Sequence, residues 1–356
     1  MNRAMLNTTD VNIDWTILIS DEFAYNFSFW VGVVALNCLN GLGVVSNIIN
    51  ITVFVKQGLR ERGNFTLFWL SISDLMGTVA QAAMSKGSLW DVELGPIVMN
   101  GQSFYSLVYY IRAMWSDISS GLTMFISIER CICVIRPLHF NSSFIARHGK
   151  VIVSVIIVTY IVYYLPFLTP AGLEAELNVE TNTSIYYAVY APYKNHYEDF
   201  NDFFGGILLC ILVPCFVFAC IILMYRGLYK SSNIRRTLTA SLGSDQAQME
   251  SGLSTKERRV VKMVFVLACL YMLSSFPQIV FISIYHFFDM YAFDIQEGKT
   301  RNLSLILDPL SIYILGIYSS FSIFVYYLFS SSFRKNFHEM VTLKLLVTKN
   351  EINVVE

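Results

Sequence analysis

Charged residues inside long apolar stretches are the residues of this chain whose chemistry most needs explaining. Glu129 and Arg130 close the apolar run 104–128, and Pro137 follows seven residues later. Charge at the end of a membrane helix is costly to desolvate, so such a pair usually has a task in ion pairing or in contact with a partner. The alternative is an arginine that reaches water along its stem, beside a solvated glutamate.

Arg112 is a second arginine in the same apolar stretch, eighteen residues before Arg130. Eighteen residues make about five helical turns and roughly 27 Å, so both arginines share one helix face on opposite sides of a bilayer. The guanidinium fork suits a carboxylate, a sulfate or a phosphate, which predicts a ligand with an acidic group. The alternatives are an internal pair, with Asp308 or an acid of 170–202, and a side chain that reaches the membrane surface. Asp117 is a poor partner, because five positions on a helix turn about 140° around its axis.

The composition is that of a membrane protein. Of 356 residues, 55% are hydrophobic and only 14% are charged, whereas a soluble domain carries about 25% charge. A helix needs about 20 mostly apolar residues to cross a bilayer. Seven runs come close to or exceed that length: 27–55, 65–85, 102–135, 151–168, 203–224, 260–288 and 303–328. We therefore predict an all-α membrane protein, a seven-transmembrane helix bundle, whose second run is the weakest because it holds Asp74 and Gln81.

The segment 332–343 is amphipathic, with Phe333 and Phe337 on one face and Arg334 and Lys335 on the other. This pattern predicts a short eighth helix along the membrane surface. The chain then divides into an extracellular N-terminal segment, the seven-span domain, the eighth helix and a cytoplasmic tail, at 1–27, 28–331, 332–343 and 344–356.

Basic residues orient the chain relative to the membrane. Lys and Arg gather in the loops 56–64, 136–150 and 225–259 and in the C-terminal tail. Because such loops stay in the cytoplasm, we predict a multi-pass plasma-membrane protein with its N-terminus outside and its C-terminus inside. Four Asn-x-Ser/Thr triplets fall on the outer side and are predicted glycosylation sites: Asn7, Asn26, Asn182 and Asn302.

The seven cysteines lie in apolar runs or at their inner ends: Cys38, Cys131, Cys133, Cys210, Cys215, Cys220 and Cys269. No cysteine falls in a polar outer segment, so we predict no structural disulfide. No Cys/His spacing suggests zinc. No histidine cluster or facing acid pair suggests an intramembrane enzyme, so we predict no catalytic residue.

Several residues along the chain have a distinctive order and spacing: Asn47 in VVSNIIN, Asp74 in LSISDL, Glu129-Arg130, Pro137-Leu138, Pro214, Pro277, Tyr326 and Phe333. Their order and spacing over residues 28–340 resemble the rhodopsin-like (class A) G-protein-coupled receptors. The two prolines match those that kink the fifth and sixth helices of that family. The runs VVSNIINITVFVKQG and SIERCICVIRPL look like the divergent chemosensory and FMRFamide-type receptors of molluscs and related invertebrates.

The chain departs from the family pattern at several motifs. Asn-Pro-x-x-Tyr becomes Ser322–Tyr326, and Cys-Trp-x-Pro becomes Ser274–Pro277. Tyr105 stands where the third helix would carry the cysteine of the outer disulfide, and the loop 170–202 has none. The usual tether of that loop is therefore in question.

The resemblance implies a switch at the inner end of the bundle. The resemblance implies an ion pair between Arg130, beside Glu129, and Glu257. It also implies that Tyr326 moves when the switch operates. A partly desolvated pair of this kind can bias a two-state helix arrangement by a few kcal/mol. The resemblance also makes Leu138 a knob that enters the G protein. The alternatives are a solvated Glu257 and a Leu138 that packs against lipid headgroups.

The resemblance further implies a sodium ion near the centre of the bundle. Asp74, Ser119, Asn47, Ser319 and Ser322 match the positions that surround it. A hard cation takes oxygen ligands, which these residues supply. The alternative is a protonated Asp74 that is hydrogen-bonded to Asn47 and Ser119.

The function predicted is that of a receptor that binds an extracellular ligand, either a chemosensory cue or a neuropeptide, and activates a heterotrimeric G protein. Serines and threonines of 225–259 are candidates for receptor kinases and arrestin binding. Membrane lipid is a further partner, and nucleic acid is not expected.

Two other functions remain as alternatives. A seven-span channel or transporter would need a polar path, which the fourth and fifth runs barely offer. A light sensor would need a lysine in the seventh run for a retinal Schiff base. The run 303–328 contains none, and Gly316 stands where it is expected, so we predict no retinal.

Overall fold

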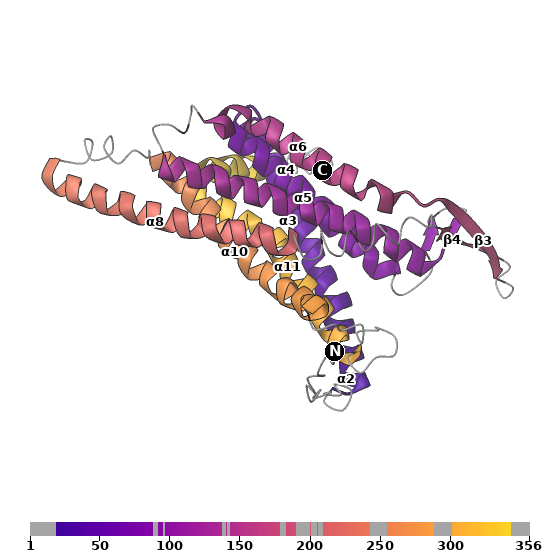
Figure 1. Cartoon of the computed structure of the whole chain (residues 1–356). Coiled ribbons are helices and arrows are strands. Elements are labelled where there is room, and N and C mark those ends of the chain that lie inside the picture. Colours follow the sequence, from indigo (N-terminus) through magenta and orange to yellow (C-terminus); the bar gives the residue numbers. More distant parts are fainter. Residues whose placement is uncertain are drawn as a thin grey trace, which may run out of the picture.

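The computed structural model describes residues 19–87, 92–94, 97–136, 140, 143–178, 183–189, 200, 205, 209–242, 255–287 and 301–342. Long helices lie side by side in these ranges, and a small sheet projects from one end (Figure 1). The long helices are α3 (Leu36–Gln57), α4 (Arg62–Gly87), α5 (Gly101–Ile135), α6 (Phe144–Leu168), α8 (Cys210–Leu242), α10 (Thr255–Phe287) and α11 (Arg301–Phe329). The helix α2 (Asp21–Phe27) and the π-helical segment η1 (Ser28–Ala35) run directly into α3.

Six helical segments in the described ranges are long and apolar enough to cross a membrane: Asp21–Gln57, Gly101–Ile135, Phe144–Leu168, Cys210–Lys230, Glu257–Val280 and Leu305–Phe329. The remaining long helix is α4, which contains the second predicted run and packs along α3 and α5. Its Asp74 and Gln81 are only 5% and 9% exposed. α4 therefore takes the seventh place of a helical transmembrane bundle by turning its polar side chains towards protein.

α5 is the central helix of the bundle. It is the most buried of the six apolar segments, and it contacts α4, α6, α8 and α10. Ile118 and Leu122 on α5 have no exposed surface. Asn100 caps its first turn, since the side-chain oxygen accepts from the backbone N–H groups of Gln102 and Ser103.

α8 and α10 extend past the apolar runs predicted for them. α8 continues to Leu242 and α10 begins at Thr255, whereas the runs cover 203–224 and 260–288. The flanking segments are rich in Lys and Arg, which are good helix formers in water. Glu257 lies in the first turn of α10, where the helix dipole favours a negative charge.

A further helix, 331–342, occupies the position predicted for the eighth helix. The hydroxyl of Ser330 caps it by accepting from the backbone N–H of Phe333 at 3.1 Å. Phe333 is fully buried, and its ring centroid lies 5.7 Å from those of Phe54 and Tyr326. These ring contacts fix the start of the helix against α3 and α11.

A four-stranded sheet at the start of α5 was not predicted. Its strands are β1 (Val92–Leu94), β2 (Ile97–Met99), β3 (Gly172–Asn178) and β4 (Thr183–Val189), in the order β1-β2-β4-β3. β3 and β4 form an antiparallel hairpin, and β4 pairs in parallel with β2. We call this end of the bundle the sheet end, and the other end of α5 the Arg130 end.

The sheet attaches the segment after α6 to the start of α5 by hydrogen bonds. The backbone N–H of Asn100 donates to the carbonyl of Tyr186 at 2.9 Å. The backbone N–H of Ala188 donates to Ser103 Oγ at 3.2 Å. Tyr105, at the predicted position of a disulfide cysteine, lies two residues after Ser103 on α5. The non-covalent contacts therefore serve as a tether at the place where the family pattern has a covalent one.

The tether can be tested with Ser103→Ala, which removes the acceptor for Ala188. We expect hydrogen exchange to rise at the amides of 183–189, because a lost hydrogen bond weakens local structure by about 1 kcal/mol. Mild dithiothreitol should leave this exchange unchanged in the unaltered protein. The control is Ser106→Ala, one turn along the same helix. Loss of protection in dithiothreitol alone would show that a thiol, and not the sheet, holds the segment.

Candidate functional sites

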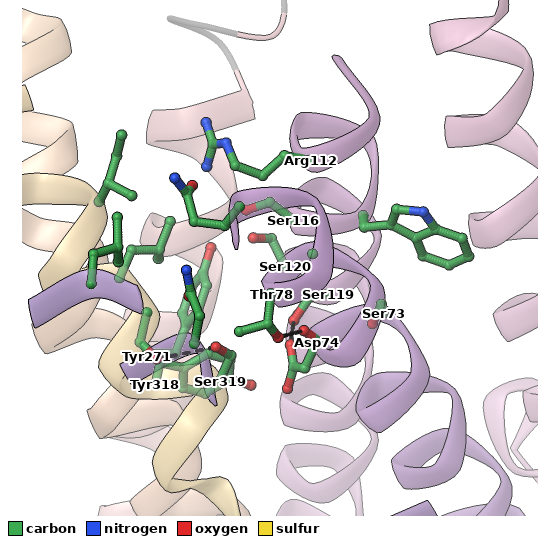
Figure 2. Close-up of a pocket in the computed structure, with 18 residues that line it drawn as sticks. Ser73, Asp74, Thr78, Arg112, Ser116, Ser119, Ser120, Tyr271, Tyr318 and Ser319 are labelled. Carbon is green, nitrogen blue, oxygen red and sulfur yellow. Dashed lines mark hydrogen bonds between the residues drawn. The ribbon is translucent and has the colours of Figure 1, made fainter. Parts of the chain in front are cut away.

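Asp74 is a buried acid on α4, surrounded by side chains of α5 and α11 (Figure 2). Ser119 Oγ donates to Asp74 Oδ1 at 2.6 Å. The Thr78 hydroxyl donates to the main-chain carbonyl of Asp74. The second carboxylate oxygen of Asp74 is buried and has no hydrogen-bond partner among the described residues. One acceptor position at this acid is thus left for a cation, a proton or a water.

A cavity of about 70 Å³ adjoins Asp74. A water needs only about 10–15 Å³ of such space, whereas drug-sized ligands occupy sites of about 300–1,000 Å³. The cavity therefore suits a small ion with water. Its polar lining includes Asn40, Ser73, Asp74, Thr78, Gln81, Arg112, Ser116, Ser119, Ser120, Tyr271, Tyr318 and Ser319.

The structure brings three of the five predicted sodium ligands to this cavity, namely Asp74, Ser119 and Ser319. Asn47 is fully buried, and its amide nitrogen donates to the carbonyl of Ser319 at 3.1 Å. Asn47 therefore braces α11 and does not line the cavity. Within the described ranges no group of three His, Cys, Asp or Glu residues could hold a metal. A monovalent ion on one carboxylate and hydroxyls is the arrangement that these residues permit.

Ser322, the remaining predicted ligand, also lies outside the cavity lining. Its hydroxyl accepts from Asn50 Nδ2 at 3.2 Å. Sequence reasoning missed Asn50 and Asn40, although a signal was present. The asparagines at 40, 47 and 50 are seven and three residues apart in one apolar run, so they share a helix face.

Arg112 lies on α5 beyond Ser116 and Ser120, further from Asp74 (Figure 2). Its guanidinium carbon is 5.4 Å from the centre of the Tyr109 ring. Its Nε is buried and has no hydrogen-bond partner in the described part of the chain. The charge of Arg112 therefore lacks a full set of acceptors.

Two acids lie near Arg112 without pairing with it. Asp117 and Asp308 are both close enough to interact with its charge, but neither is among the ion pairs within 4.0 Å that the described residues form. Asp117 instead accepts from the hydroxyl of Tyr164 at 2.7 Å. The predicted ion pair between Arg112 and Asp308 is therefore not formed, and the carboxylate of Asp117 is hydrogen-bonded to Tyr164 instead.

The predicted switch residues gather at the Arg130 end. A cavity of about 430 Å³ there is lined by Glu129, Arg130, Glu257 and Tyr326, among others. Glu129 is 3% exposed, and its Oε1 lies 3.8 Å from Arg130 Nη2. Arg130 Nε is buried without a hydrogen-bond partner in the described ranges. The pairing of Arg130 with Glu257 stays a prediction, and Leu138 lies outside the described residues.

The two predicted kink prolines lie inside helices, Pro214 in α8 and Pro277 in α10. A proline removes one helical hydrogen bond and crowds the preceding turn. Pro166 in α6 and Pro309 in α11 also lie inside helices and have the same effect, although they were not among the predicted kink prolines.

The predicted glycosylation sites differ in how accessible their asparagines are in the structure. Asn26 is exposed on α2, whereas Asn7 and Asn182 lie outside the described residues. Asn302 has no exposed surface, and its amide nitrogen donates to the carbonyl of Ile19 and to Asp21 Oδ1, both at 2.7 Å. A glycan needs that nitrogen, so the structure disfavours Asn302 as an acceptor.

The Asp74 site yields a test with purified protein. We expect sodium chloride to raise the unfolding temperature by about 2–4 °C over choline chloride, because an ion that binds only the folded state stabilises it. Asp74→Asn keeps the shape but removes the charge, so it should abolish the difference. Ser322→Ala, outside the cavity, is the control and should keep it. Equal unfolding temperatures for the unaltered protein in both salts would favour the protonated, hydrogen-bonded Asp74.

Comparison with known proteins agrees with this geometry. A family model described as "7 transmembrane receptor (rhodopsin family)" matches residues 46–321. A curated protein of Mizuhopecten yessoensis, "Rhodopsin, GQ-coupled", is 20% identical over an alignment that covers 96% of this chain. The chain spans 66% of that protein's length. The family match covers more than half of the chain, so the chain belongs to the rhodopsin family of seven-transmembrane receptors.

Proposed function

We propose that this chain is a plasma-membrane receptor that binds an extracellular ligand at the sheet end and activates a heterotrimeric G protein at the Arg130 end. The observation that carries the proposal is the 430 Å³ cavity, where Arg130 lies among Glu129, Glu257 and Tyr326 and its Nε has no hydrogen-bond partner among the described residues. A guanidinium with missing acceptors at an open cavity suits the carbonyl oxygens at the end of an inserted partner helix.

The proposed switch works between α5 and α10. Arg130 on α5 and Glu257 on α10 line the same cavity. Attraction between them favours a closed arrangement, and an outward displacement of α10 separates them. A ligand that binds the open arrangement more tightly shifts the population towards it. Phosphorylation of the segment 225–259, followed by arrestin binding, is part of the same proposal.

The G protein to test first is suggested by the Mizuhopecten yessoensis protein, whose name describes it as GQ-coupled. That name also includes the word rhodopsin, which raises light sensing as a second function. The seventh helix α11 contains no lysine. At Gly316, a Cβ would lie 3.1 Å from Leu39 of α3, so this position is tightly packed. These residues do not fit a covalent retinal linkage.

The proposed ligand carries an acidic group that binds Arg112. The support is the buried Nε of Arg112, which has no hydrogen-bond partner within the ranges that the structure describes. The neighbouring Asp117 and Asp308 add negative charge, which disfavours a ligand with several acids and suits one that also has an amine. Amino acids, and peptides with an acidic residue or a free C-terminus, are therefore the first ligands to screen, as chemosensory cues or neuropeptides.

Arg130→Ala tests the coupling site. We expect surface staining to persist while activation of the G protein falls to background, because the charge that meets the partner is gone. Arg136→Ala, an exposed arginine just beyond α5, is the control. Unchanged signalling at unchanged surface level would remove Arg130 from the coupling site.

Glu257→Ala tests the switch. Removing one member of the pair should raise ligand-independent signalling by about fivefold, which corresponds to roughly 1 kcal/mol in the closed-to-open equilibrium. The measurement is basal second messenger per receptor at the surface. A basal signal equal to that of the unaltered protein would mean that the pair is absent or negligible.

Arg112→Gln tests the ligand class. The potency of an acidic agonist should fall by at least tenfold, since a hydrogen bond to a charged group contributes about 1.5–3 kcal/mol. Arg112→Lys keeps the charge without the fork and should give an intermediate loss. An agonist without any acidic group that acts equally on both variants would contradict the assignment.

A further inference from the structure

We propose that Arg62 and Lys150 form a reciprocal clamp between α4 and α6, and that this clamp positions the wall of the 430 Å³ cavity for coupling. The proposal rests on the proposed function at the Arg130 end. The sequence marks both residues only as basic charges near the membrane edge. The structure gives each a specific pair of contacts across the gap between the two helices.

Arg62 is the first residue of α4. Its guanidinium donates to the carbonyl of Ala146, in the first turn of α6. The same guanidinium lies over the ring of Phe140, 5.5 Å from its centre. Ala146 and Phe140 are only 6% and 7% exposed, so both contacts are shielded from water. Charged hydrogen bonds and cation–π contacts are strongest in such surroundings.

Lys150 makes the matching contacts in the opposite direction. Its ammonium group donates to the carbonyl of Leu59, in the turn before α4, at 2.9 Å. It also lies 5.3 Å from the centre of the Phe65 ring on α4. Each cation thus binds one backbone carbonyl and one aromatic ring of the opposite segment. Two unrelated surface charges that merely face the lipid headgroups would not produce this reciprocity.

The clamp spans a break in α6. His148 has non-helical backbone angles, with φ −110° and ψ 15°, and it lies between Ala146 and Lys150. Side chains that enter a helical hydrogen-bond ladder are a recognised cause of such kinks. The first turn of α6 is therefore held by Arg62, while the helix beyond the kink is held by Lys150.

The clamp also reaches the coupling residue. Gly63 follows Arg62, and a Cβ on Gly63 would lie 3.2 Å from Arg130 Nη2. The guanidinium of Arg130 thus lies against the backbone that the clamp fixes. Arg62, Gly63, Arg130 and Phe140 all line the 430 Å³ cavity. Arg62 and Lys150 are accordingly positioning residues, which set where the wall of the cavity stands relative to Arg130.

The test uses full-length protein in lipid nanodiscs, without a ligand. The variants are Arg62→Gln, Lys150→Gln and the double variant, with Lys150→Arg as the conservative change. Arg60→Gln and Arg147→Gln are matched controls, because both arginines are exposed and lie close to the clamp residues in sequence. The first readout is hydrogen exchange at the amides of 143–150. The second is basal nucleotide exchange on a purified Gq heterotrimer.

We expect each single Gln variant to speed hydrogen exchange at 143–150 and to lower nucleotide exchange about fivefold, the ratio expected from losing one such contact. Nucleotide exchange should be only slightly lower in the double variant than in either single variant, because Arg62 and Lys150 act as one unit. Lys150→Arg and both controls should match the unaltered protein.

Three results would overturn the proposal. Unchanged hydrogen exchange in both Gln variants would show that the clamp is absent. Faster hydrogen exchange with unchanged nucleotide exchange would remove its positioning role, and so would an equal fall in nucleotide exchange in the two controls. The last result would mean that basic charge alone matters. A further comparison separates this proposal from the proposed function. If neither the unaltered protein nor Glu257→Ala stimulates any G protein, the proposed function fails and the positioning role fails with it, while hydrogen exchange still decides whether the clamp exists.

Discussion

The burial of Asp74 is the constraint on which the rest of the bundle depends. α4 carries this acid and Gln81 in its apolar run, so it cannot face lipid on all sides. Packing between α3 and α5 shields its polar side, and the hydrogen bond from Ser119 at 2.6 Å ties the acid to α5. The neighbouring helices must therefore supply polar groups at this depth, and they do so through serines and asparagines.

The contact between α3 and α11 shows how those polar groups also hold helices together. A Cβ on Gly43 would lie 2.7 Å from Ser320 Oγ and 2.8 Å from Thr78 Cγ2, so a larger residue would force these side chains to shift. The hydroxyl of Ser320 donates to the carbonyl of Leu39 at 3.2 Å across the same interface. Close packing at small residues together with interhelical hydrogen bonds is what stabilises helices in lipid, where the hydrophobic effect does not act between them.

The sequence predicted the helices well, because long apolar runs are visible without a structure. Glu129 and Arg130 were singled out as charge at the end of such a run, whereas Glu257 came from the family resemblance, and all three line one cavity. The sheet could not be predicted, since β1 and β2 have only three residues each and the pairing of β2 with β4 joins distant segments. The contacts of Arg62 and Lys150 were also out of reach, because any basic residue at a membrane edge gives the same pattern. Assignment of Asn47 as an ion ligand followed the family pattern and overlooked the carbonyl of Ser319 as its partner.

The two arginines of α5 present one physical problem at opposite ends of a helix. Arg112 and Arg130 each keep a buried Nε without an acceptor in the described residues, and α5 is a continuous helix of 35 residues between Gly101 and Ile135. Because α5 is the central and most buried span, a signal between the two ends has to involve the helices that pack around it. α6, α8 and α10 all contact α5, and each contains a proline, Pro166, Pro214 or Pro277. A proline weakens the helical ladder at one point, so these three helices are the elements best suited to bend against α5 when either arginine gains its missing acceptor.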